Sequence, residues 1–76
     1  LLDLESARAE VTAAADGIRA ATEARRVVEE RFKAGVAINT EVLDAQQALL
    51  QAELDRTRAL AEVRLAEARL DRAIGR

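Results

Sequence analysis

The sequence predicts an all-α protein, a long antiparallel coiled-coil hairpin of two helices. The 76 residues include no proline and only three glycines, and Ala, Leu, Glu and Arg dominate, which is typical of long helices. Apolar residues recur at heptad spacing in both halves of the chain. Between the halves, a short break around Gly35 carries the residue types that end one helix and begin another.

The first helix is predicted over about residues 3–33. One column of its heptad repeat consists mostly of large side chains, and a second column consists mostly of alanine. These columns are Leu4, Val11, Ile18, Arg25 and Phe32, and Ala7, Ala14, Ala21 and Val28. Two such columns form a seam against a partner helix. Gly17 lies inside this helix, where glycine costs about 1 kcal/mol relative to alanine.

The chain is predicted to turn at about residues 34–39. Gly35 can adopt the left-handed conformation that ends a helix, and basic side chains in the preceding turn suit the negative end of the helix dipole. Asn39 or Thr40 is expected to cap the next helix, because a side-chain oxygen there can accept from its first N–H groups. A connection this short makes the two helices antiparallel neighbours.

The second helix is predicted over about residues 41–74, with acidic side chains in its first turn. Its seam columns are Val42, Leu49, Arg56, Val63 and Leu70, and Ala45, Ala52, Ala59, Ala66 and Ala73. Alanine throughout the second column lets the helix axes approach toward the short end of the usual range of about 8–10 Å. The register that the short turn imposes places Leu4 beside Leu70.

Both helices carry more apolar surface than one seam can bury. The additional stripes are Leu43, Leu50, Leu54, Ala61, Leu65 and Ala68, and Leu2, Ala9, Ala13, Ala20, Ala24 and Val27. Two apolar faces on each helix predict neighbours on two sides, since a two-helix hairpin is a weak independent fold. We therefore expect the hairpin to pack side by side with further helices, in an oligomer or in a larger chain, and we expect residues 1–76 to be a single hairpin fragment. Arg25 and Arg56 interrupt the seam, and each is expected to pack its stem while its guanidinium reaches water.

The composition argues against catalytic and metal sites. The chain has no histidine, no cysteine and no glycine-rich phosphate loop. Its net charge is −2 with both signs interspersed, which argues against a nucleic-acid surface. Most carboxylates have a basic residue three or four positions away, as on a solvated helix face: Glu5 with Arg8, Asp16 with Arg19, Glu23 with Arg26, Glu29 with Lys33, and Glu53 with Arg56. We expect no enzyme and no cofactor.

The residues around the turn carry a family resemblance. Arg31-Phe32-Lys33-Ala34-Gly35-Val36, followed by Thr40-Glu41-Val42-Leu43-Asp44-Ala45-Gln46, resembles the periplasmic tip of the TolC-like outer-membrane efflux protein family. The resemblance extends over essentially the whole chain, because residues 2–8 look like the start of the helix that enters the tunnel of the family and residues 68–75 look like the end of the return helix. The Val-Leu-Asp-Ala-Gln form is more similar to the C-terminal repeat of that family than to its N-terminal repeat.

The resemblance implies a role in export. Members of the family are homotrimers whose hairpins form a periplasmic α-barrel, held in the outer membrane by β-strands that lie outside this segment. The barrel is an export duct, and its hairpin tips dock a periplasmic adaptor protein that joins the duct to an inner-membrane transporter. The chain is accordingly expected to be a periplasmic segment of an outer-membrane protein that takes part in drug, metal or protein export.

Carried over by position, the resemblance assigns two groups of residues at the tip. The adaptor-docking residues are Arg31, Ala34, Gly35, Val36, Ala37 and Thr40, and the candidate aperture acids, which would favour cations, are Glu41 and Asp44. Gly35 and Thr40 have capping roles whether or not a partner docks, and both acids also suit a helix N-terminus. The segment 36–38 lacks the basic residue that some members place after the tip glycine, which weighs against a gate within this hairpin.

Two other functions stay open from the sequence. The chain could be the coiled-coil hairpin of the periplasmic adaptor itself, or a generic helical interaction module. Adaptor tips carry a different pattern around an Arg, a Leu and a Ser, and residues 31–46 do not match it. This favours the duct over the adaptor.

Overall fold

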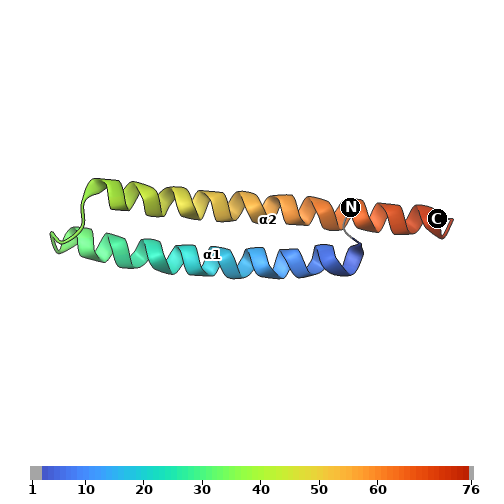
Figure 1. Ribbon diagram of the computed structural model, residues 1–76, viewed down its shortest axis with the longest axis horizontal. Helices are drawn as coiled ribbons and strands as arrows, with labels where there is room; N and C mark the ends of the chain where they lie inside the picture. Colours follow the sequence, from blue (N-terminus) through green and yellow to red (C-terminus); the bar gives the residue numbers. More distant parts are fainter. Residues whose placement is uncertain (1–2, 76) are drawn as a thin grey trace.

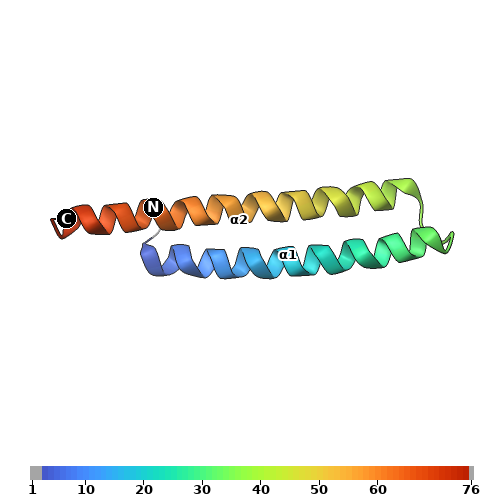
Figure 2. The ribbon, with the colours of Figure 1, turned by 180° about the vertical axis from the view of Figure 1, so that it is seen from behind.

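The computed structural model describes residues 3–75, which fold into two α-helices joined by a short turn (Figure 1). Helix α1 spans Leu4–Lys33 and helix α2 spans Asn39–Ala73. They run antiparallel along a rod that is 61 Å long and 15 Å in each other direction. Both views place the turn at one end and show α2 extending past the start of α1 at the other (Figure 2). The predicted all-α hairpin is confirmed.

The helices bury the seam that the heptad columns predict. The buried residues are Ala7 on α1 and Leu49, Ala59 and Ala66 on α2, and all four belong to those columns. Most other column residues are half-buried. The exposed ones are Phe32, Arg56, Leu70 and Ala73, of which Phe32 adjoins the turn and the last two lie near or beyond the start of α1. Because alanine dominates the seam, the apolar area that it buries is small.

Contacts at the open end of the hairpin define the register. Leu4 and Leu70 line the same shallow hollow, as the short turn predicts. Beside it, Arg8 Nη2 lies 3.9 Å from Glu67 Oε2 on the other helix. The expected pairing of Arg8 with Glu5 is therefore wrong for this arginine. An exposed pair such as this one contributes about 0.2–1 kcal/mol, and it favours one register over its neighbours.

Two of the expected pairs within α1 are present. Arg19 binds the Asp16 carboxylate. Arg26 donates from Nε and Nη2 to the two Glu23 oxygens at 2.9 and 2.7 Å. The bonds from Arg26 hold the pKa of the Glu23 carboxyl below its usual value. These pairs lie on exposed helix faces, as the sequence predicts.

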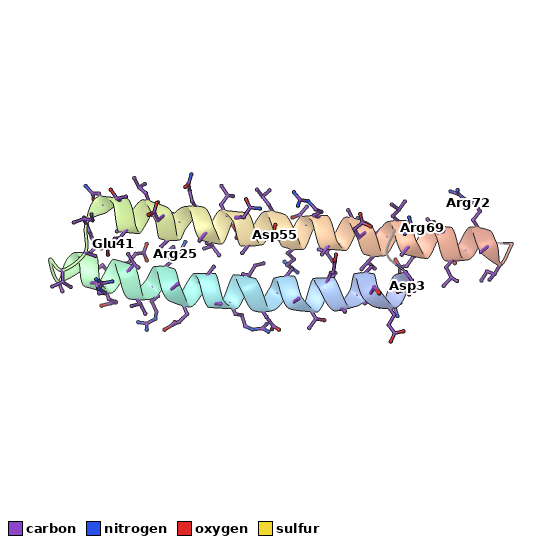
Figure 3. The ribbon with its side chains drawn as sticks, viewed as in Figure 1. Asp3, Arg25, Glu41, Asp55, Arg69 and Arg72 are labelled. Carbon is purple, nitrogen blue, oxygen red and sulfur yellow. The ribbon has the colours of Figure 1, made fainter. Side chains whose placement is uncertain are left out.

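The two arginines of the seam columns differ in their surroundings. The Arg25 side chain lies between the helices and is 39% exposed, so its stem packs in the seam (Figure 3). Its Nε is buried, has no hydrogen-bond partner within residues 3–75, and lies 4.0 Å from Glu29 Oε1. Glu29 was expected to pair with Lys33. Arg56 is exposed, so only Arg25 fits the expectation of a packed stem.

Candidate functional site: the hairpin tip

The tip begins where α1 ends in a Schellman arrangement, in which a left-handed residue turns the chain and two carbonyl groups of the last turn gain partners. Gly35 follows the C-cap residue Ala34 and has a φ of +79°. Its N–H donates to the Phe32 carbonyl at 3.0 Å, and the Val36 N–H donates to the Arg31 carbonyl at 2.9 Å. The left-handed glycine predicted from the sequence is confirmed.

Helix α2 begins differently from the expectation. Its N-cap is Ile38, whose backbone is extended (φ −102°, ψ 163°) and whose side chain makes no capping bond. Asn39 and Thr40 lie inside the first turn, so the prediction that one of them caps the helix is wrong. The Ile38 carbonyl accepts from the N–H groups of Glu41 at 3.0 Å and Val42 at 3.3 Å, which closes the first turn earlier than expected. The exposed N–H groups ahead of them are left to solvent.

The tip presents apolar side chains that neither helix covers. Val36 and Ile38 are each 64% exposed, and Phe32 and Leu43, on the helix ends beside the turn, are also exposed. Exposed apolar side chains that gather in one place are typical of an interaction site. The tip is therefore suited to contact another molecule end-on.

The predicted docking residues gather at this end of the rod. The structure places Arg31, Ala34, Gly35, Val36 and Thr40 at the surface and leaves Ala37 half-buried. The sequence reasoning missed Ile38, which is as exposed as Val36. The signal that could have found Ile38 is its position: it is a large apolar residue in the turn, outside both seam columns.

The two candidate aperture acids lie one turn apart on α2 but have different surroundings. Glu41 is half-buried, and its Oε2 lies 3.6 Å from Arg31 Nη1, so an arginine of the same hairpin offsets part of its charge. Figure 3 labels Glu41 beside the turn. Asp44 is exposed and lines shallow grooves on the outer side of α2 together with Gln47 and Leu50. Of the two acids, Asp44 presents the more accessible carboxylate.

Each helix also carries the second apolar face that the sequence predicts. The exposed residues of these faces are Leu43, Leu50, Leu54, Ala61, Leu65 and Ala68 on α2, and Ala9, Ala13, Ala20, Ala24 and Val27 on α1. Leu50 and Leu54 are 56% and 51% exposed, although both are large. Leu2, predicted to belong to the stripe of the first helix, lies outside the described residues. The face of α2 is rich in leucine, whereas that of α1 is small and rich in alanine.

The described residues present exposed apolar surfaces on both helices and at the tip. Within residues 3–75, no group of His, Cys, Asp and Glu side chains could hold a metal ion. Over the same range, neither helix is long and apolar enough to cross a membrane. The exposed apolar side chains on the outer faces of the helices and at the tip are suited to packing against other protein surfaces.

Comparison with known protein families identifies the family of this hairpin. The family model described as outer membrane efflux protein matches residues 1–76, which is the whole chain. The chain belongs to this family. Outer membrane efflux proteins are transport ducts associated with the outer membrane and are not enzymes, and they work in efflux systems together with partners. The family predicted from the sequence is thereby confirmed. Neither the curated proteins nor the solved structures compared with the chain give a match.

Proposed function

We propose that this hairpin is a wall segment and the periplasmic tip of the export duct of an efflux or secretion system. The observation that carries the proposal is that each helix has two apolar faces, one buried in the seam and one exposed. A helix in a closed barrel wall needs a neighbour on each side, whereas a helix in an isolated pair needs only one. Family membership favours the duct over the adaptor hairpin and over a generic module.

The neighbours in this proposal are further hairpins of the same protein, assembled as a homotrimer and held in the outer membrane by parts outside this chain. The leucines on the outer face of α2 and the small residues on the outer face of α1 differ in size. Large side chains pack well against a surface of small ones, because small residues let the helix axes approach. The exposed apolar area of the hairpin is thus accounted for as wall contact.

At the tip, the proposal adds docking of a periplasmic adaptor protein and, through it, of an inner-membrane transporter. Val36 and Ile38 supply exposed apolar anchors at the end of the rod. Anchors of this kind carry most of the binding energy when a partner buries them in a pocket. The surrounding docking residues are Arg31, Ala34, Gly35, Ala37 and Thr40.

The proposal also places Glu41 and Asp44 near the aperture of the duct, where acidic side chains favour cations. Asp44 contributes more of this field, because Glu41 is paired with Arg31. Glu41 lies in the first turn of α2, so it keeps its dipole role as well.

The test of docking is a single charge at the tip. Val36→Asp leaves the main-chain N–H and carbonyl of residue 36 available for their hydrogen bonds with Arg31, because the Val36 side chain takes part in neither bond. We expect export to be lost while the level of trimer in the outer membrane stays normal. Val36→Leu keeps an apolar anchor and is the matched control, with export retained. Normal export by Val36→Asp refutes docking at the tip. Gly35→Asp is less clean, since a side chain at φ +79° strains the turn itself.

The test of the wall contact uses the outer face of α2. Leu54→Glu places a charge on a side chain that the hairpin itself leaves 51% exposed, so the isolated hairpin is expected to keep its helicity. In the assembled protein the same charge is buried against a neighbour, and we expect the trimer to be lost. A normal trimer level in Leu54→Glu contradicts the wall assignment at this position.

A further inference from the structure

One side chain bridges the turn from helix to helix. The Arg31 guanidinium belongs to the last turn of α1, and its Nη1 lies 3.6 Å from Oε2 of Glu41 in the first turn of α2. Its Nη2 donates to the Val36 carbonyl at 3.4 Å. A single planar group therefore contacts α2 and an exposed part of the loop at once.

Val36 is held by Arg31 through two separate groups. The Val36 N–H donates to the Arg31 main-chain carbonyl at 2.9 Å, and the Val36 carbonyl accepts from the Arg31 side chain. The first bond belongs to the end of α1 and needs no particular side chain at position 31. The second bond exists only because residue 31 is an arginine whose guanidinium folds back over the loop.

On the α2 side, no side chain within residues 3–75 is bonded as a cap to the N-terminus of the helix. The N-cap Ile38 makes no side-chain hydrogen bond. The Schellman bonds fix only the α1 end of the loop. The contact of Arg31 with Glu41 is thus an ion pair that ties the loop-side end of α1 to the start of α2.

Arginine suits this position better than lysine. The guanidinium presents separate nitrogens in one plane, so one can face a carboxylate while another donates to a carbonyl. A lysine ammonium is a compact point charge that can pair with Glu41 but does not reproduce the fork. Substitution of Arg31 by lysine therefore separates the two contacts, because lysine can keep the ion pair with Glu41 but does not reproduce the fork that also reaches the Val36 carbonyl.

We propose that Arg31 and Glu41 form a clasp that holds Val36 and Ile38 in the position in which the tip docks. The inference rests on the proposed docking function. Arg31 is then a positioning residue that acts through the loop, and Glu41 serves the shape of the tip in addition to any effect of its charge at the aperture. The clasp turns an exposed loop into a preformed surface, which lowers the entropic cost of docking.

The first measurement is hydrogen exchange of the Val36 amide in the full-length, assembled protein, because exchange there requires the turn to open. Glu41→Gln removes the ion pair, and we expect exchange to become about two- to five-fold faster, the factor that corresponds to an exposed pair. Arg31→Ala also removes the bond to the Val36 carbonyl and is expected to exceed Glu41→Gln. Arg31→Lys is expected to fall between wild type and Arg31→Ala.

Arg26→Ala is the matched control. Arg26 is also an exposed arginine of α1, but its guanidinium binds Glu23 within the same helix. We expect the exchange of the Val36 amide in Arg26→Ala to equal that of wild type. Equal exchange in Arg31→Ala and Arg26→Ala overturns the clasp.

Export by the same variants tests the link to docking. Reduced export by Arg31→Ala and Glu41→Gln, with a normal trimer level, supports it. Faster Val36 exchange with undiminished export overturns the link and leaves the clasp as a purely local contact. Failure of the docking proposal is recognised separately, because it requires normal export by Val36→Asp, a variant that places a charge on the docking surface itself.

Discussion

Replacing a glycine by alanine is expected to have opposite effects at two positions of this chain. At Gly35 the backbone has a φ of +79°, a conformation that costs an L-residue about 1–2 kcal/mol. At Gly17, inside α1, an added Cβ meets no atom within 4 Å. Alanine there gains about 0.5–1 kcal/mol from helix propensity. Gly35→Ala should therefore lower the free energy of unfolding, Gly17→Ala should raise it, and the two should differ by about 2 kcal/mol.

Thermal unfolding of the chain, followed by far-ultraviolet circular dichroism, measures both effects. Each 1 kcal/mol corresponds to a shift in Tm of about 4–8 °C for a domain of this size. Gly35→Asn is the control, because asparagine tolerates the left-handed conformation better than alanine and should recover part of the loss. If Gly35→Ala is as stable as Gly17→Ala, the turn does not depend on a left-handed residue and the account of the tip is wrong.

Two further predictions concern the start of α1 and the seam. Asp3 accepts a hydrogen bond from the Ser6 N–H at 2.8 Å, and this bond holds the pKa of the Asp3 carboxyl below its ordinary value. Because the folded-state pKa is the lower one, the stabilisation is fully present above the unfolded pKa of about 3.9 and is lost as the pH falls through the folded pKa. Asp3→Asn keeps the cap without titrating, so an acid titration of helicity should lose this component; an unchanged titration contradicts the assignment. Leu49 is 9% exposed and Leu50 is 56% exposed. Leu49→Ala should lower the free energy of unfolding by about 2 kcal/mol, whereas Leu50→Ala should change it by less than about 0.5 kcal/mol in the isolated chain. Equal effects in urea unfolding would show that the seam does not lie on the face assigned to it.

The seam was predictable because it depends on a repeat that a single chain displays. Residues seven apart share a helix face, so the columns that contain Leu49 and Ala59 identify the buried side without knowledge of the partner. The break at Gly35 was predictable for a related reason. A glycine after a basic last turn is a local signal for the end of a helix, and the short turn leaves the antiparallel pairing as the outcome.

The cap of α2 was mispredicted because the capping preference of a side chain is only one of the factors that decide where a helix starts. Asn39 and Thr40 have suitable side chains, but the extended Ile38 supplies the first accepting carbonyl and closes the turn ahead of them. The sequence alone does not show in which direction the chain leaves Gly35. That direction decides where α2 can begin. The N–H groups of an exposed first turn can then donate to water in place of a side-chain cap.

The place of most proposed docking residues at the tip was predictable, whereas the contacts among the residues around the turn were not. The positions of Gly35 and Val36 follow from the turn, so their exposure at the tip could be anticipated. The pairing of Arg31 with Glu41 could not, because both residues also fit local roles at the helix dipoles. Arg8 presents the same difficulty, since a carboxylate in its own helix is a plausible partner and the observed one, Glu67, lies on the other helix.

The sequence by itself determined two helices, the face that each buries, the place of the turn and the family to which the chain belongs. Each of these depends on periodicity or on a residue type at one position, which the order of residues contains directly. Only the tertiary structure decided which charges meet across the hairpin, where α2 begins and that Ile38 is as exposed as Val36. A charged side chain chooses its partner by distance in space, and that distance is set once the two helices have packed in one register.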